Sequence, residues 1–178
     1  MIDKRFIRPE VLVTNFHIRP GDKVGDFGAG AGNFATFLSK AVGSTGLVYA
    51  CEVQKTLADK LSEKVQLERL SNVKVLWSDF EEIGGSKLED GLLDVAVMVN
   101  TLFQLENRQV AMEEIYRVLR PGGKLVLVDW SESWSGLGPT PTDVINERQA
   151  RDLIESVRFT FERAFDAGDH HYGLAFRK

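Results

Sequence analysis

The chain has 178 residues, of which 43% are hydrophobic and 27% charged, and its formal net charge is −4. This length fits one ordinary domain, so we expect residues 1–178 to form a single domain in which residues 1–20 are a short N-terminal cap. The acidic balance argues against nonspecific nucleic-acid binding, which needs a concentrated basic surface.

Cysteine content and apolar runs narrow the class further. The single cysteine, Cys51, excludes an intramolecular disulfide and a metal site built from several cysteines. Residues 1–5 lack the apolar run of a signal peptide, and the longest apolar runs are too short to span a bilayer. We therefore expect a cytoplasmic protein that holds no metal.

Apolar strands alternate with amphipathic helices along most of the chain. A strand is predicted over residues 23–27, after a turn at 19–22, and a helix follows over residues 32–42 with its apolar side chains on one face. The next elements are a strand over 47–52, a helix over 54–67, strands over 73–77 and 93–99, a helix over 108–119 that ends at Arg-Pro-Gly-Gly (120–123), and a strand over 124–130.

The C-terminal part has a different order. A helix over residues 143–157 precedes two strands, 159–165 and 171–176, which a turn at 166–169 joins into a hairpin. The alternation predicts an α/β fold with a doubly wound, mostly parallel seven-stranded sheet, an antiparallel last strand and helices on both faces.

Ligands of such sheets bind beyond the carboxyl ends of the strands, so the residues that follow each strand are the candidates for a site. The first strand leads into Asp26-Phe-Gly-Ala-Gly-Ala-Gly-Asn33, whose glycines allow tight turns and the close approach of a ligand. The helix that follows presents free N–H groups. By itself such a loop fits NAD, FAD or S-adenosylmethionine (SAM), or serves only as a tight turn.

Polar residues also follow the next three strands. Glu52 can accept two hydrogen bonds from a ribose diol, or be a solvated loop carboxylate. Asp79 can accept from an adenine amino group beside the ring of Phe80, or cap a helix. Asn100 can contact the cofactor or the substrate, or cap the helix that follows it.

Taken together, residues 20–130 resemble the cofactor-binding core of the class I (Rossmann-like) SAM-dependent methyltransferases. The acidic, glycine-rich loop is similar to the family's first motif, residues 49–52 to its ribose-binding motif, residues 78–80 to its adenine-binding motif, 93–100 to its fourth motif, and 119–128 to the turn and strand that end the core. The resemblance implies that Asp26 contacts the methionine amino group. The cofactor-binding residues that it implies are Asp26, Gly28, Ala29, Gly30, Gly32, Asn33, Glu52, Val53, Asp79, Phe80 and Asn100.

Within this family the chain looks most like the small-molecule branch that includes the quinone-biosynthesis methyltransferases. The Pro-Gly-Gly turn, Val128-Asp129-Trp130 and Gly138-Pro139 carry that likeness. Methyl transfer from a sulfonium mainly needs the nucleophile and the methyl group to be aligned. We therefore expect no conspicuous catalytic motif, and the sequence contains none. The candidate residues of the acceptor pocket are Phe6, His17, Phe103, Trp130 and Trp134. Aromatics there would wall an apolar pocket, whereas the alternatives are core closure, sheet-edge cover and, for His17, a surface position.

Other functions stay open at this point. Residues 19–24 and 46–49 also resemble some tRNA and protein methyltransferases, although the acidic balance speaks against nucleic acid. A nicotinamide-dependent oxidoreductase would carry Gly-x-Gly-x-x-Gly, whereas here the third glycine comes one residue early. Binding motifs report binding and not turnover, so a non-catalytic SAM-binding protein is a further alternative. The oligomeric state is open, with a dimer among the options.

Overall fold

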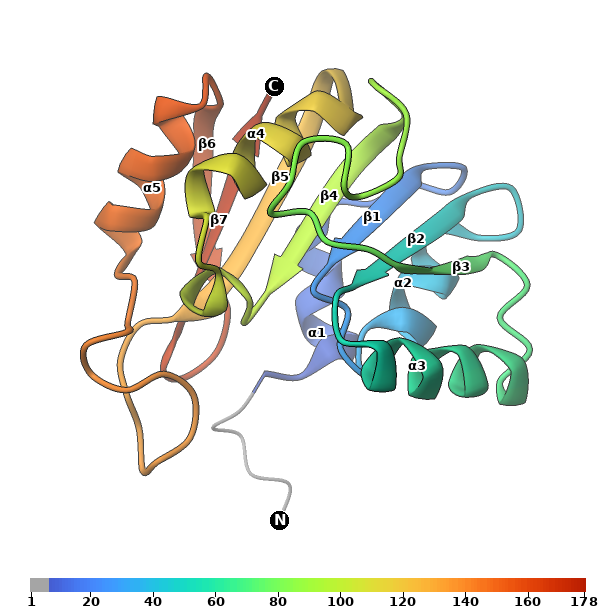
Figure 1. Ribbon diagram of the computed structural model, residues 1–178, viewed down its shortest axis with the longest axis horizontal. Coiled ribbons are helices and arrows are strands. Elements are labelled where there is room, and N and C mark those ends of the chain that lie inside the picture. The colour runs from blue at the N-terminus through green and yellow to red at the C-terminus, as the bar shows by residue number, and fades with distance from the viewer. Residues whose placement is uncertain (1–6) are drawn as a thin grey trace.

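The computed structural model describes residues 7–178 and contains one seven-stranded sheet, in the strand order β3-β2-β1-β4-β5-β7-β6. The strands are β1 (Lys23–Phe27), β2 (Leu47–Glu52), β3 (Val73–Trp77), β4 (Leu93–Val99), β5 (Leu119–Trp130), β6 (Thr160–Asp166) and β7 (His171–Arg177). The pairs among β1 to β5 are parallel, and β7 runs antiparallel to both of its neighbours. The predicted fold class is therefore confirmed (Figure 1).

Helices and one long connection cover the two faces of the sheet. The helices are α1 (Pro9–Leu12), η1 (Val13–Phe16), α2 (Ala35–Val42), α3 (Lys55–Leu67), η2 (Leu102–Gln104), α4 (Arg108–Val118) and α5 (Glu147–Ser156). One face packs against α4, α5 and the connection between β3 and β4, and the other against α1, η1, α2 and α3 (Figure 1). Within residues 7–178, no helix has the length and apolar character that crossing a bilayer requires.

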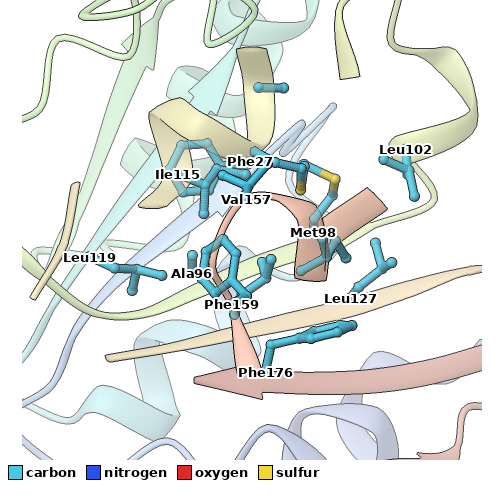
Figure 2. Close-up of a cluster of buried hydrophobic side chains, with 14 of the residues drawn as sticks. Phe27, Ala96, Met98, Leu102, Ile115, Leu119, Leu127, Val157, Phe159 and Phe176 are labelled. Carbon is cyan, nitrogen blue, oxygen red and sulfur yellow. The ribbon is translucent and has the colours of Figure 1, made fainter. Parts of the chain in front are cut away.

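Two buried clusters hold these layers together. The cluster under α4 and α5 includes Phe27, Met98 and Phe176, and Figure 2 shows how these side chains meet between the sheet and the helices. The opposite cluster includes Val24, Val97 and Val128. Successive strand residues point to opposite faces, so in β1 Asp26 shares the face of Val24 and lies toward α1 and α2.

Two predicted helix starts were wrong. The first long helix begins at Ala35 rather than at residue 32, because residues 29–34 form turns in which Gly32 N–H donates to the Ala29 carbonyl. The last helix begins at Glu147 rather than at residue 143, since Asn146 and Gln149 form a capping box at that point.

The turn at 120–123 belongs to a strand. The helix α4 ends at Val118, and β5 begins at Leu119, which pairs with Leu93 before an irregularity in the register. The turn also bonds to the chain on the other side of β5, directly after β7, because Gly122 N–H donates to the Lys178 carbonyl at 3.0 Å. The prediction of a helix to residue 119 and a strand from residue 124 is therefore corrected.

Candidate functional site

The glycine-rich loop after β1 is tied to the end of β2. The N–H groups of Gly28 and Ala29 both donate to the Cys51 carbonyl at 3.0 Å, and Gly30 N–H donates to Glu52 Oε2 at 2.9 Å. Gly28 has φ +81°, and a Cβ there would lie 2.4 Å from Thr101 Oγ1. Only glycine fits this position, so the path of the loop depends on the glycine in its sequence.

Two cavities open at the carboxyl ends of the strands, one on each side of this loop, and both are lined by Gly28, Gly30 and Asn100. The first, of about 250 Å³, is further lined by Glu52, Val53, Asp79 and Phe80, and the second, of about 420 Å³, by Ile7, Pro9, Asp26, Ala29, Asn33, Phe34, Lys64 and Val99. A Cβ on Gly30 would meet nothing within 4 Å, so this residue faces open space.

Asp26 carries the most unusual electrostatics of the site. Its side chain is buried, with 3% exposed, and its Oδ2 has no hydrogen-bond partner. Burial, and then the nearby charge of Glu52, raise the pKa of Asp26 to about 7. A buried acceptor left without a donor costs about 1–3 kcal/mol, so this carboxyl is poised for a ligand that brings a donor or a positive charge.

Asn100 presents a second acceptor of the same kind at the end of β4. Its Oδ1 is buried without a partner, although its N–H donates to the Val128 carbonyl at 2.9 Å. The residue has φ +54°, a left-handed conformation that asparagine tolerates better than most residues. The backbone thus holds this amide in place at the shared wall of the two cavities.

Glu52 combines a structural role with a free capacity to accept. It is 5% exposed, and its two oxygens accept from the N–H groups of Gly30 and Gln54, at 2.9 and 2.8 Å. Each carboxylate oxygen has a second lone pair, so further donors can still bind.

The third strand supplies the far wall of the first cavity. Asp79 is exposed and accepts from Glu81 N–H at 2.9 Å through Oδ1. Phe80 is buried and meets Phe27 edge to face, with ring centroids 5.3 Å apart. The consecutive residues Asp79 and Phe80 therefore give this wall one exposed carboxylate and one aromatic ring held by packing.

Comparisons with known proteins fit this arrangement. The family model described as "Methyltransferase domain" matches residues 25–127, which is more than half of the chain. A crystal structure of a SAM dependent methyltransferase from Aquifex aeolicus is 32% identical, superposes with a TM-score of 0.88, and is matched over 96% of this chain and 89% of that one. The chain belongs to the class I SAM-dependent methyltransferase family.

Curated relatives of this methyltransferase share its core. The ubiquinone/menaquinone biosynthesis C-methyltransferase UbiE of Hydrogenovibrio crunogenus is 31% identical over 118 residues, covering 65% of this chain and 44% of that protein. UbiE of Paraburkholderia phytofirmans is 28% identical over 160 residues, covering 82% and 64%. The chain spans about half the length of curated UbiE proteins that it matches.

The structure brings together most of the residues that the sequence singled out for the cofactor. All of them line one of the two cavities except Gly32. This glycine has a packing role instead, because a Cβ there would lie 2.3 Å from the Leu61 side chain of α3. Gly32 therefore lets helix α3 approach the loop, and we no longer count it among the cavity residues.

The candidates for the acceptor pocket are scattered. Phe6 lies outside the described residues. His17 is exposed at the opposite, amino end of the sheet, in a small cavity with Lys124 and Arg177, so it is removed from the pocket candidates. Phe103 is half-buried in η2 and lines neither cavity.

The two tryptophans lie at the carboxyl end of β5, as expected, but they do not line the two cavities. Trp130 is 7% exposed and packs on His171, with ring centroids 4.3 Å apart. Trp134 stacks on His170 at 4.8 Å. Both rings therefore cover the end of β7.

Sequence reasoning missed several cavity residues. Lys64 of α3 reaches the second cavity and donates to the Gly32 carbonyl at 2.8 Å, and Ile7 and Pro9 close it from the N-terminal segment. A lysine on the surface side of a helix has no motif to mark it. The only indication in the sequence is the hydrophobic pattern of α3, which places Leu61 inward. Lys64 lies about one helical turn after Leu61, and so near the same face of the helix.

Proposed function

We propose that this methyltransferase transfers the methyl group of SAM to a small quinol-type acceptor. The observation that carries the proposal is the buried, unpartnered Asp26 carboxyl beside a glycine loop that separates two cavities. The kinds of reaction named for the curated relatives support a small-molecule acceptor. Because the match covers only 44% of the first of these relatives, their acceptor is not carried over beyond its chemical class.

The residues present fit SAM. Asp26 is placed to pair with an ammonium group, and Asn100 Oδ1 offers an acceptor next to it. Gly30 leaves the room that a side chain would fill. On the other side of the loop, Glu52 would accept from the ribose hydroxyls, while Asp79 and Phe80 would hold the adenine.

When bound, SAM supplies an electrophilic methyl carbon on a sulfonium, whose departure needs no acid. The protein then has to position the two reactants, because alignment accounts for much of the rate of such a displacement. Asp26 and Glu52 would hold the amino-acid part and the ribose of the cofactor from two neighbouring strands, β1 and β2. The apolar residues Ile7, Pro9 and Val99 form part of the lining of the larger cavity.

Methyl transfer itself tests the proposal. The full chain is incubated with methyl-labelled SAM and, in separate reactions, a dihydroxynaphthalene, total tRNA or a mixture of unfractionated proteins. We expect label in the dihydroxynaphthalene only, and far less of it with Asp26→Asn at the same SAM concentration. Label in RNA or protein alone would overturn the acceptor class, and tight SAM binding without transfer to any of them would make the protein a SAM-binding protein rather than an enzyme.

Gly30 provides a separate test of where the cofactor lies. Gly30→Leu places a side chain into the space shared by the cavities, and we expect SAM binding measured by calorimetry to weaken at least tenfold, about 1.4 kcal/mol. Gly84→Leu is the matched control, because Gly84 also has a positive φ and an open Cβ position but lies away from both cavities. Both variants should lose about 1–2 kcal/mol of stability from the left-handed backbone. Equal SAM affinity in the two would place the cofactor elsewhere.

A further inference from the structure

Three buried side-chain atoms in residues 7–178 lack a hydrogen-bond partner: Asp26 Oδ2, Asn100 Oδ1 and His171 Nε2. The first two belong to the cofactor cavities. His171 is the first residue of β7, which runs antiparallel to β5, so it also lies at the carboxyl end of the parallel strands. The proposed function uses the first two atoms and leaves the third unexplained.

Strand register places His171 on the same face of the sheet as Asp26. Asp26 is paired with Val97, two residues before Val99, and Val99 is paired with Val128. Trp130, two residues further along β5, is paired with His171. Paired residues and alternate residues of a strand share a face, so Asp26, Val99 and His171 all point toward the layer of α1.

The surroundings of His171 fix which of its nitrogens carries the proton. Nδ1 lies 2.9 Å from the Asp169 carbonyl oxygen, which can only accept, so Nδ1 is the donor and Nε2 keeps its lone pair. Burial, and then the neighbouring His170, lower the pKa of His171, although the bond to Asp169 opposes them. The lowered pKa favours the neutral ring, in which the lone pair of Nε2 is free to accept a proton.

The connection between β5 and α5 packs against two neighbours of this histidine, Trp130 and His170. A Cβ on Gly138 would lie 2.4 Å from the Trp130 ring, so the connection rests directly on that ring, which in turn packs on His171. Glu132 Oε1 lies 2.7 Å from His170 Nδ1, and Trp134 stacks on the same histidine. Figure 1 shows this connection, in light orange, extending beyond the carboxyl end of β5. The charged and titratable groups placed around His171 are Asp169, His170 and Glu132.

We propose that His171 is the proton acceptor of the reaction, whose Nε2 receives the hydroxyl proton of a phenol-type methyl acceptor when the 131–142 connection opens. This inference rests on the proposed function and names the residue that activates its substrate. The O–H bond of the acceptor breaks and its proton moves to Nε2, giving an imidazolium whose Nδ1–H stays on the Asp169 carbonyl.

The pair left on the phenolate oxygen, delocalised to the neighbouring ring carbon, forms the new bond to the methyl carbon, and the C–S pair returns to sulfur. The ring proton moves to oxygen and restores the hydroxyl, and the imidazolium releases its proton to water. The net products are the methylated phenol, the thioether and one proton.

The pH dependence of His171→Asn separates a base from a structural residue. Asparagine keeps an N–H donor near the position of Nδ1 and removes Nε2. With the full chain, a dihydroxynaphthalene and labelled SAM, we expect kcat to fall about a hundredfold near neutral pH, within the range for a general base. The loss should shrink toward high pH, where the phenol ionises unaided, and the Kd for SAM should stay within about twofold. His17→Asn, at the far end of the sheet, is the control and should match the unsubstituted protein.

Other results would overturn the assignment. A constant fractional loss at every pH, or no loss, would make His171 a structural residue even while the unsubstituted protein transfers methyl groups. If that protein binds SAM but does not methylate the probe, the acceptor class of the proposed function fails. The contact between His171 and a phenol is then tested by the nitrogen NMR chemical shift of Nε2 when dihydroxynaphthalene and S-adenosylhomocysteine are added. A change in this shift would support a contact between Nε2 and the phenol, and an unchanged shift would overturn it.

Discussion

Asp26→Asn is expected to weaken SAM binding about a hundredfold at roughly pH 8 and at the same time to stabilise the ligand-free protein. Above pH 7 the native carboxyl is ionised in a buried site without any donor to its Oδ2. An ammonium group would satisfy that charge, whereas a neutral amide gives it nothing to pair with. Calorimetry on both proteins measures the loss of affinity.

The pH dependence of binding follows from the same carboxyl. With a pKa of about 7, Asp26 is mostly protonated below neutrality in the ligand-free protein. SAM affinity should therefore rise about tenfold per pH unit up to pH 7 and level off above it, with proton release below that point. Asp26→Asn should show no such slope. A flat profile in the unsubstituted protein would mean that Asp26 does not pair with the cofactor.

The stability of the ligand-free protein should fall with rising pH, whereas its affinity for SAM should rise. The folded protein holds the Asp26 proton between pH 3.8 and about 7, where the unfolded chain has released it, so stability falls as pH rises through this window. Asp26→Asn removes the penalty, which is on the order of 1–4 kcal/mol above pH 7. Asp129→Asn is the control. Asp129 is equally buried, and burial raises its pKa to about 6, so Asp129→Asn should remove a similar penalty above that pH, but Asp129 lines neither cavity and its loss should leave SAM binding unchanged.

Glu114→Ala is expected to destabilise the protein by about 3–5 kcal/mol, the cost of breaking a buried charge pair. Glu114 in α4 is fully buried and accepts from Arg117, at 2.8 and 2.7 Å, and from Gly84 N–H at 2.8 Å and Ser86. Alanine would leave these donors without their acceptor. Urea unfolding measures the change, and Glu155→Ala, which breaks an exposed pair with Arg151, should cost less than about 0.5 kcal/mol.

The acid sensitivity of the protein should change with the same substitution. Burial opposes the ionisation of Glu114, but hydrogen bonds from Arg117, Ser86 and Gly84 outweigh it and lower its pKa to about 2. The stabilisation is complete above pH 4.5, where the unfolded carboxyl is ionised, and is lost as pH falls toward 2. Unfolding curves of Glu114→Ala between these values should be flatter than those of the unsubstituted protein. An unchanged slope would assign the acid sensitivity to other carboxyls.

The sequence alone determined the order and nature of the elements. The strands β1 to β4 begin and end where their apolar runs do, because strands buried on both faces tolerate few polar residues. The polar residues Asp26 and Glu52 lie in the last two residues of β1 and β2, and Asn100 directly follows β4, so the sequence also predicted which end of the sheet forms the site. The prediction of one domain over residues 1–178 stays a prediction.

Only the tertiary structure decided contacts between segments that are distant in the chain. The Pro-Gly-Gly turn reads locally as a helix stop, yet partners on both sides, Leu93 and Lys178, draw it into β5. His17 and His171 both lie near an end of the chain, and neither belongs to a motif that marks it for function. The β5–β7 register places His171 beside Trp130 at the carboxyl end of the sheet, while η1 carries His17 to the amino end. Such pairings depend on how strands align in space, which no local spacing of residues encodes.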